Sequence, residues 1–202
     1  MKPSRQATTK RLIVGISGAS GAEIGIQLLH AMQRQPEWET HLIISSGARR
    51  TIKLETAYSV EQVEALATHH HPVGDVGASI ASGTFKTEGM VVAPCSMKTV
   101  AGIAHGYAQN LLLRAADVVI KERRKLVLVA RETPLSAIHL NNLLVLANAG
   151  AVILPPMLTY YHRPATIQEM TTHIVGKILD VFGIELAEFK RWNPAANPPA
   201  NS

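Results

Sequence analysis

The sequence, with 202 residues and a mass of 21.8 kDa, has the size of one compact domain with a complete hydrophobic core. Apolar residues make up 47% of the chain and charged residues only 17%, which excludes a disordered protein. No apolar run approaches the ~20 residues that cross a bilayer. Lys and Arg outnumber Asp and Glu by 20 to 15, but these cations are dispersed and aromatic residues are only 4%, so we expect no binding of nucleic acid.

The chain ends and the single cysteine indicate the cellular compartment and the bounds of this domain. Cys95 has no second cysteine to pair with, and residues 1–5 lead into no apolar signal segment, so we expect a cytoplasmic protein. Residues 1–10 show no periodicity, and residues 193–202 carry Pro and Asn in a pattern that suits neither a helix nor a central strand. We therefore predict flexible tails at 1–10 and 193–202 and a single domain at 11–192.

Short aliphatic runs alternate with helix-like stretches along the middle of the chain. The runs have the continuous apolar character of strands buried in a parallel sheet, and they occupy residues 12–16, 41–44, 90–93, 126–129 and 151–154. The intervening stretches predict helices at residues 21–34, 48–54, 60–68, 98–104, 111–122, 136–149 and 167–182. This alternation predicts an α/β fold with a doubly wound parallel sheet.

Residues 69–88 fit this alternation poorly. We expect a minor strand at residues 78–80 and a solvated loop at His69-His70-His71. Consecutive residues point in different directions, and no carboxylate or further histidine stands at a recognised metal-ligand spacing from this triplet. The sequence therefore predicts no metal site there.

The first strand leads into a glycine-rich segment, and ligands of doubly wound sheets bind beyond the carboxyl ends of the strands. In Gly15-Ile16-Ser17-Gly18-Ala19-Ser20-Gly21, the glycines let the backbone approach a phosphate at a helix N-terminus. The spacing differs from the dinucleotide pattern G-x-G-x-x-G and no Walker A lysine follows, so a mononucleotide fits better than NAD or ATP. The alternative is a tight strand-to-helix turn with Ser20 as the N-cap.

Two later strand ends carry further candidates. A second strand-to-helix turn suited to an anion lies at Pro94-Cys95-Ser96-Met97-Lys98-Thr99. The Ser96 and Thr99 hydroxyls can cap a helix there, and the N–H groups of its first turn can face the anion. Within this segment, Cys95 suits packing better than catalysis. Arg131 and Glu132 follow an aliphatic strand, so these charges are either functional or paired with each other.

Several cations and a tyrosine could serve a second phosphate. Arg114 and Lys121 are seven residues apart and share one face of a predicted helix. Tyr161 follows a Pro-Pro loop, and its hydroxyl could join the charge of Lys177 around an anion. The alternatives are a solvated helix end at Lys121, a surface loop at Tyr161 and an exposed helical lysine at Lys177.

Taken together, these segments resemble the flavin prenyltransferase family, the UbiX/Pad-type proteins once described as aromatic acid or 3-octaprenyl-4-hydroxybenzoate decarboxylases. The matching stretches follow one another in order between Arg11 and Trp192, at residues 15–22, 94–99, 114–124, 126–136, 138–142 and 150–156. The resemblance implies a Rossmann-like, flavodoxin-type single domain that assembles into a homododecamer and binds FMN between subunits.

The resemblance also implies the residues of the site. The positions that match the family's FMN contacts are Gly18, Ala19, Ser20, Ser45, Ser96, Met97, Lys98, Thr99 and Arg131. The positions that match contacts to dimethylallyl phosphate are Tyr161, Lys177, Lys121 and Arg131. The positions implied in catalysis are Ser20, Glu55, Arg114, Lys121, Glu132 and Trp192, and no metal ligand is implied.

The implied reaction joins a dimethylallyl group to N5 and C6 of reduced FMN and releases phosphate, and the product serves a partner UbiD-type decarboxylase. Lys177 stands where many relatives carry Arg, and Met97-Lys98 replaces small residues, so monophosphate and pyrophosphate donors both stay open. Two alternatives share the fold. One is an FMN-dependent decarboxylase of the phosphopantothenoylcysteine type, and the other is a non-catalytic flavin-carrying subunit of an aromatic acid decarboxylase.

Overall fold

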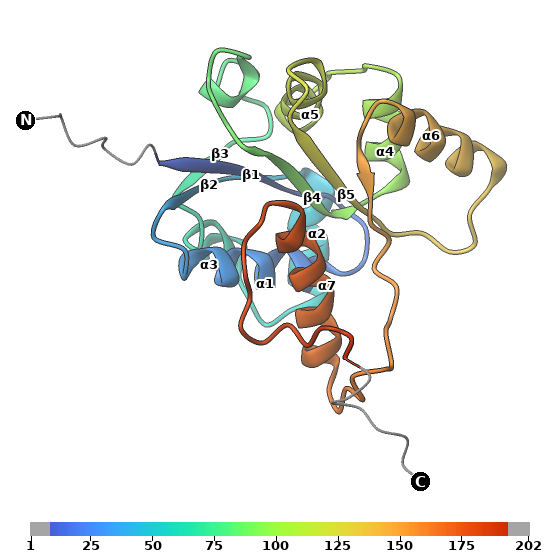
Figure 1. Cartoon of the computed structure of the whole chain (residues 1–202). Helices are drawn as coiled ribbons and strands as arrows, with labels where there is room; N and C mark the ends of the chain where they lie inside the picture. Colours follow the sequence, from blue (N-terminus) through green and yellow to red (C-terminus); the bar gives the residue numbers. More distant parts are fainter. Residues whose placement is uncertain (1–8, 194–202) are drawn as a thin grey trace, which may run out of the picture.

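A computed structural model describes residues 9–193, which form a six-stranded parallel sheet with helices on both faces (Figure 1). The strand order is β3-β2-β1-β4-β5-β6. The strands are β1 (Lys10–Ile16), β2 (Trp38–Ile44), β3 (His69–His71), β4 (Gly89–Cys95), β5 (Lys125–Ala130) and β6 (Val152–Ile153). The helices are α1 (Ala22–Gln33), α2 (Ser46–Glu55), α3 (Val60–Glu64), α4 (Met97–Ala104), α5 (Leu111–Lys121), α6 (Ala137–Asn148) and α7 (Ile167–Val181), with a short 3₁₀ helix, η1 (Ser79–Ala81).

The aliphatic strands are buried because helices cover both faces of the sheet. Every residue of β4 is buried, as expected for a central strand of a parallel sheet. One core lies between the sheet and α1, α2, α3 and α7, and a second core lies between the sheet and α4, α5 and α6. This arrangement confirms the predicted doubly wound α/β fold.

Local capping chemistry fixes where most helices begin. The side chains of Ser45, Ser96, Asn110, Ser136 and Thr166 accept a backbone N–H from the first turn of α2, α4, α5, α6 and α7. Each such bond satisfies a donor that a helix N-terminus otherwise leaves unpaired.

Helix α1 begins differently. Its N-cap is Gly21 in the left-handed region, with φ of 103° and no side-chain cap, so the alternative role of Ser20 as the N-cap is wrong. A left-handed backbone favours glycine because a Cβ atom would be strained there. The Gly21 N–H instead donates to Oε2 of Glu55, at the end of α2, over 2.8 Å.

The chain reverses its winding direction between β1 and β4, which are neighbours in the sheet. The segments that follow these strands therefore diverge and leave a crevice at the carboxyl edge. Ser17 joins the two segments, because its hydroxyl donates to the Pro94 carbonyl over 2.9 Å and accepts the Ser96 N–H over 2.7 Å. Close to it, a Cβ on Gly18 would stand only 3.0 Å from Cα of Gly47, so glycine lets the first loop lie against α2.

Residues 69–88 differ from the prediction. His69, His70 and His71 form the edge strand β3 rather than a solvated loop, because they pair in parallel with β2 and place His69 opposite His41. The predicted minor strand at residues 78–80 is also wrong, since η1 occupies this segment and inserts Ile80 into the core. Burial and the neighbouring rings of His69 and His71 lower the pKa of His41 to about 4.

The other predicted elements are present with adjusted bounds, most visibly β6, which is only two residues long. Strand β1 begins at Lys10, one residue before the predicted domain start. The predicted tails fall mainly on residues 1–8 and 194–202, which lie outside the described residues, so they stay a prediction. In the part of the chain that the structure describes, no helix combines the length and apolar character needed to cross a membrane.

Candidate functional site

A cavity of about 870 Å³ opens at the carboxyl edge of the sheet, beside the crevice between β1 and β4. This volume is within the range of small-molecule and cofactor sites. Five predicted FMN contacts line it: Gly18, Ser45, Ser96, Lys98 and Thr99. The predicted contacts Ala19, Ser20, Met97 and Arg131 are not among its lining residues.

Two helix N-termini meet this cavity. Ser45 caps α2 and Ser96 caps α4, and both serines line the cavity wall. The Ser96 and Thr99 hydroxyls lie 3.1 Å apart, and Lys98 adds a cation beside them. Backbone N–H donors, hydroxyls, a lysine and the positive ends of two helix dipoles together form an environment for a phosphate group.

Part of the remaining wall comes from segments to which no function could be assigned from the sequence. Val73 and Gly74 follow β3, and Tyr107, Gln109 and Asn110 lie between α4 and α5. Only Asn110 carried a local signal, because an asparagine before an apolar run is a typical N-cap. Beneath the site, Cys95 is fully buried and desolvation raises the pKa of its thiol well above the usual range, which confirms a packing role.

Four further predicted residues lie around the strand ends. Ser20 is exposed on the glycine-rich turn, and Glu55 accepts the Gly21 N–H beside it. Arg131 follows β5 and donates its backbone N–H to the Cys95 carbonyl over 3.0 Å, which fixes its position next to the segment that begins α4. Glu132 accepts the N–H of Thr133, and the described residues include no ion pair between Arg131 and Glu132, so their alternative role as a structural pair is wrong.

Tyr161, Lys177 and Trp192 gather around α7. The Tyr161 ring meets the Trp192 ring edge-on with centroids 5.2 Å apart, and its hydroxyl lies 3.4 Å from Nε2 of His173. His173 is one helical turn before Lys177, and burial, the neighbouring His162 and the Lys177 charge lower the pKa of His173. Neither His173 nor the stacked His162 ring, 4.8 Å away, could be identified as functional from the sequence. An isolated histidine, such as His173 in a helix of mainly apolar character, carries no functional signal.

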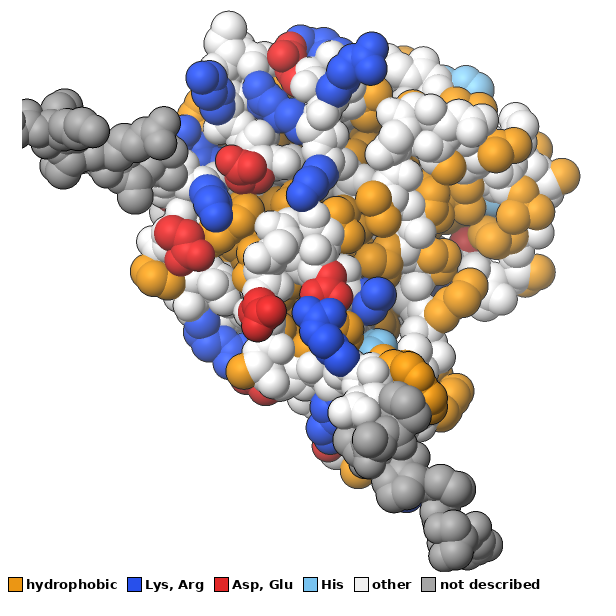
Figure 2. Space-filling model, in the orientation of Figure 1, with side chains coloured by type: hydrophobic (Ala, Val, Ile, Leu, Met, Phe, Trp, Pro, Cys, Tyr) orange, Lys and Arg blue, Asp and Glu red, His pale blue; other side chains and the backbone are white. Residues whose placement is uncertain are grey.

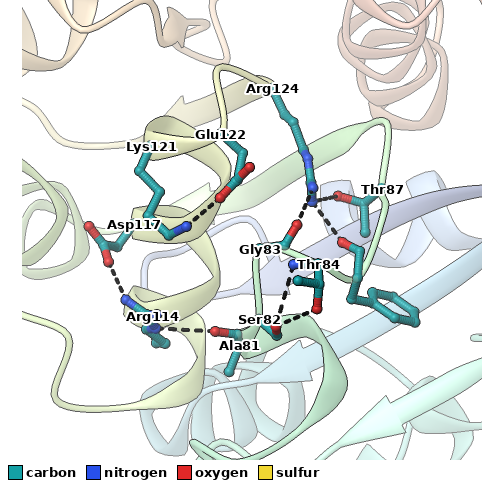
Figure 3. A network of polar contacts seen from close by, with 11 residues as sticks. Ala81, Ser82, Gly83, Thr84, Thr87, Arg114, Asp117, Lys121, Glu122 and Arg124 are labelled. Carbon is teal, nitrogen blue, oxygen red and sulfur yellow. Dashed lines mark hydrogen bonds and ion pairs between the residues drawn. The ribbon is translucent and has the colours of Figure 1, made fainter.

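Arg114 and Lys121 belong to a different environment on α5 (Figure 3). Arg114 donates to the Ala81 carbonyl over 3.2 Å and to Asp117 over 2.6 Å, while Lys121 pairs with Glu122. Helix α5 packs on one face of the sheet and α7 on the other. Within one chain, the structure therefore does not bring Arg114 and Lys121 together with Tyr161 and Lys177.

Comparisons with known proteins agree with this geometry. Residues 1–183 match the family described as Flavoprotein. The flavin prenyltransferase UbiX of Neisseria meningitidis serogroup B is 50% identical over 188 residues, which cover 93% of this chain and 99% of that protein.

Two solved structures are similar over most of the chain. A dodecameric FMN-dependent UbiX-like decarboxylase from Escherichia coli O157:H7 superposes with a TM-score of 0.90 and 52% identity, covering 91% of this chain and 99% of that one. AnUbiX (PadA1), solved in complex with FMN and dimethylallyl pyrophosphate, superposes with a TM-score of 0.89 and 48% identity, covering 91% and 97%. With the sheet order and the phosphate-suited cavity, this similarity along nearly the whole chain shows that the protein belongs to the flavin prenyltransferases of the Flavoprotein family.

Proposed function

We propose that this protein transfers a dimethylallyl group from a dimethylallyl phosphate to reduced FMN. The observation that carries the proposal is the cavity at the carboxyl edge, where two capped helix N-termini and Lys98 surround space for a flavin mononucleotide. The relatives support the same assignment, because one is a flavin prenyltransferase and another was solved with FMN and dimethylallyl pyrophosphate.

The residues present fit FMN as the acceptor substrate. Ser96, Lys98 and Thr99 offer hydroxyls, backbone N–H groups and a cation to the flavin phosphate, and Ser45 offers the start of a second helix. FMN bound there supplies the nucleophilic atoms N5 and C6 of its reduced ring system. The predicted contacts Gly18, Ala19, Ser20, Met97 and Arg131 complete this proposed binding set, with the first three on the turn that Glu55 holds through Gly21.

The other proposed site residues act on the prenyl donor, dimethylallyl phosphate. Tyr161 and Lys177 bind its phosphate, and the positive charges of Lys121, Arg131 and Arg114 stabilise the anion that develops as the allylic C–O bond breaks. The face of Trp192 shelters the electron-poor allyl group as the new bond to N5 forms. As the N5–C and C6–C bonds form, Ser20 and Glu132 accept the protons that leave N5 and C6. One proton passes to the prenyl double bond and the other to the released phosphate. No metal ion enters these steps.

The residues that we propose for the prenyl donor lie in two groups on opposite faces of the sheet. One complete donor site therefore requires residues from a second chain. We propose a homododecamer, as in the E. coli UbiX-like structure, in which neighbouring chains bring α5 of one subunit to α7 of another. Helix α6 supports this assembly, because its exposed surface carries Ile138, Leu140, Leu144 and Val145, which we call the α6 patch. Figure 2 shows hydrophobic side chains gathered on the side of the molecule where α6 lies. Monomeric proteins rarely leave such a surface uncovered.

The proposed product is prenylated FMN, which needs a consuming enzyme. We propose a UbiD-type decarboxylase as that partner and the cytoplasm as the compartment, since the family resemblance implies the first and the single unpaired cysteine favours the second.

The decisive experiment mixes the purified full chain with reduced FMN and dimethylallyl monophosphate without oxygen, and in parallel with the pyrophosphate. We expect a flavin that is heavier by one prenyl unit, with release of phosphate or pyrophosphate, and loss of this product in Lys121→Ala and Glu132→Ala. Bound but unmodified FMN with both donors would contradict the proposal. Decarboxylation of a cysteine-containing substrate would instead support the decarboxylase alternative, and flavin transfer without chemistry would support the carrier subunit.

A further inference from the structure

Strand pairing at the edge of the sheet brings Glu39, His41 and His69 together, although His69 follows His41 by 28 positions in the sequence. 

Parallel pairing of β2 with β3 places His69 directly opposite His41, and Glu39 lies two residues before His41 on the same face of the sheet. β3 is the outermost strand, so this cluster borders the solvent-facing edge of the sheet (Figure 1). We call Glu39, His41 and His69 the edge cluster.

The edge cluster presents three atoms that could bind one metal ion. Each side chain offers one ligand atom, and all three atoms lie within 4.8 Å of one another. Ligand atoms around a tetrahedral Zn²⁺ are about 3.3 Å apart, given metal–ligand distances of 2.0–2.1 Å. His69 is exposed on the edge strand, so a small rotation of its side chain can close the remaining gap.

His41 provides the strongest indication of a ligand. Its side chain is buried, and its Nε2 atom has no hydrogen-bond partner among residues 9–193. Its Nδ1 atom lies 3.0 Å from Nε2 of His71, so a proton on Nδ1 donated to His71 leaves a lone pair on Nε2 of His41. Buried polar atoms are rarely unpaired, and a metal-bound histidine characteristically donates its other N–H to a neighbour in this way.

Glu39 is also oriented as a ligand would be. Its Oε2 atom accepts a hydrogen bond from Nε of Arg11 over 2.9 Å, and no hydrogen bond to its Oε1 atom is found in the described residues. Arg11 is in turn positioned over the ring of Phe85, whose edge meets the ring of His41. A carboxylate held by one oxygen keeps the other available, as in metal sites whose carboxylate ligands are hydrogen-bonded by outer residues.

We propose that Glu39, His41 and His69 bind a divalent transition metal ion of the zinc class. Two imidazoles and one carboxylate suit Zn²⁺ and its neighbours Co²⁺ and Ni²⁺, with water in the open position. At about 3.3 Å per residue, His41 is roughly 13 Å along β2 from Ser45, so the ion stays outside the proposed flavin reaction. Its effect is to hold the short edge strand β3 against β2.

The test uses the full chain without an affinity tag of histidines, freed of metal by a chelator and titrated with Zn²⁺ in a calorimeter. We expect one Zn²⁺ per chain and a higher melting temperature, because a ligand that binds the folded state stabilises it. His69→Gln removes an exposed ligand without disturbing the core, and we expect binding at least about tenfold weaker. Glu39→Gln tests the carboxylate in the same way, and Co²⁺ absorption reports the coordination.

His70 supplies the matched control. It is the next residue of β3, it points to the opposite face and it lies 3.3 Å from Glu64, so His70→Gln should bind Zn²⁺ within about twofold of the unmodified chain. Unchanged FMN binding in His69→Gln would show that its fold is intact. The proposal is wrong if the unmodified chain binds no Zn²⁺ at micromolar concentration, if His69→Gln binds it equally well, or if His70→Gln loses it to the same extent.

Discussion

The cavity at the carboxyl edge, which we propose for the flavin, and the residues that we propose for the prenyl donor are built in different ways. The cavity is lined by residues that follow β1, β2, β3 and β4 and by the region from α4 to the start of α5, so the fold of one chain assembles it. The residues proposed for the donor phosphate are divided, with Lys121 on α5 and Lys177 on α7, on opposite faces of the sheet. We therefore expect one chain to form the proposed flavin cavity by itself, whereas the proposed transfer reaction requires neighbouring chains.

The largest expected effect comes from breaking that assembly. Leu140→Glu together with Leu144→Glu puts two charges on the exposed α6 patch, one helical turn apart. We expect smaller oligomers in sedimentation, retained FMN binding, and prenyl transfer reduced about a hundredfold or more, because cations needed at the donor phosphate are withdrawn. Val76→Glu, at an exposed apolar residue outside the patch, serves as the control.

Equal losses of FMN binding and prenyl transfer in the α6 double variant would contradict the distinction between the two regions. A dodecamer that persists in this variant would show that α6 is not the covering surface.

A second variant tests the proposed flavin cavity within one chain. In Gly18→Ala, the new Cβ would lie 3.0 Å from Cα of Gly47, so the backbone of the glycine-rich turn must shift. Overpacking of this kind costs about 1–3 kcal/mol, and we expect FMN to bind roughly ten- to a hundredfold more weakly, measured by flavin fluorescence. Gly74→Ala is the matched control, because Gly74 lines the same cavity but has no atom within 4 Å of the added Cβ. Equal weakening in both variants would show that the approach of Gly18 to Gly47 is not what shapes the site.

The difference between the cavity and the proposed donor residues also explains which features could be predicted from the sequence. Aliphatic runs identified the central strands, and residues such as Ser45 and Ser96 could be assigned to the site because they follow those runs directly. Strand β3 was missed because its three histidines carry no apolar signal and are held in the sheet by pairing with β2, 28 residues earlier. Contact between segments distant in the sequence leaves no local pattern.

The residues proposed for the prenyl donor illustrate a second limit of prediction from the sequence. The resemblance named Lys121 and Tyr161 for one phosphate, yet the separation of α5 from α7 could be seen only once the two cores were known. His173 was missed for the opposite reason, since its contact with Tyr161 spans only twelve residues but depends on how the loop after β6 returns to α7. Neither spacing nor residue type reports the path of that loop.

A third variant sharpens the comparison at the donor phosphate. Lys177→Ala removes a positive charge from α7. We expect KM for dimethylallyl monophosphate to rise about tenfold or more with FMN binding unchanged, because a charge-assisted hydrogen bond to the donor phosphate is lost. Lys177→Arg should lower KM severalfold, since a guanidinium can bind phosphate through two parallel bonds. Steady-state kinetics with both donors checks this. A change in FMN affinity equal to the change in KM would place Lys177 in the flavin region instead.

The smallest expected effect concerns the support of Tyr161. His173→Gln disturbs the 3.4 Å contact between His173 and the Tyr161 hydroxyl, and we expect kcat/KM to fall by roughly two- to tenfold, the value of one neutral hydrogen bond. Because burial, His162 and Lys177 lower the pKa of His173, its ring is neutral at pH 7 and gains a proton only under acidic conditions. Activity of the unmodified chain should therefore fall only on the acidic side of the ordinary histidine pKa, and His173→Gln should flatten this acidic limb. In a Tyr161→Phe background, His173→Gln should cost nothing further, and an additive loss would show that His173 acts independently of Tyr161.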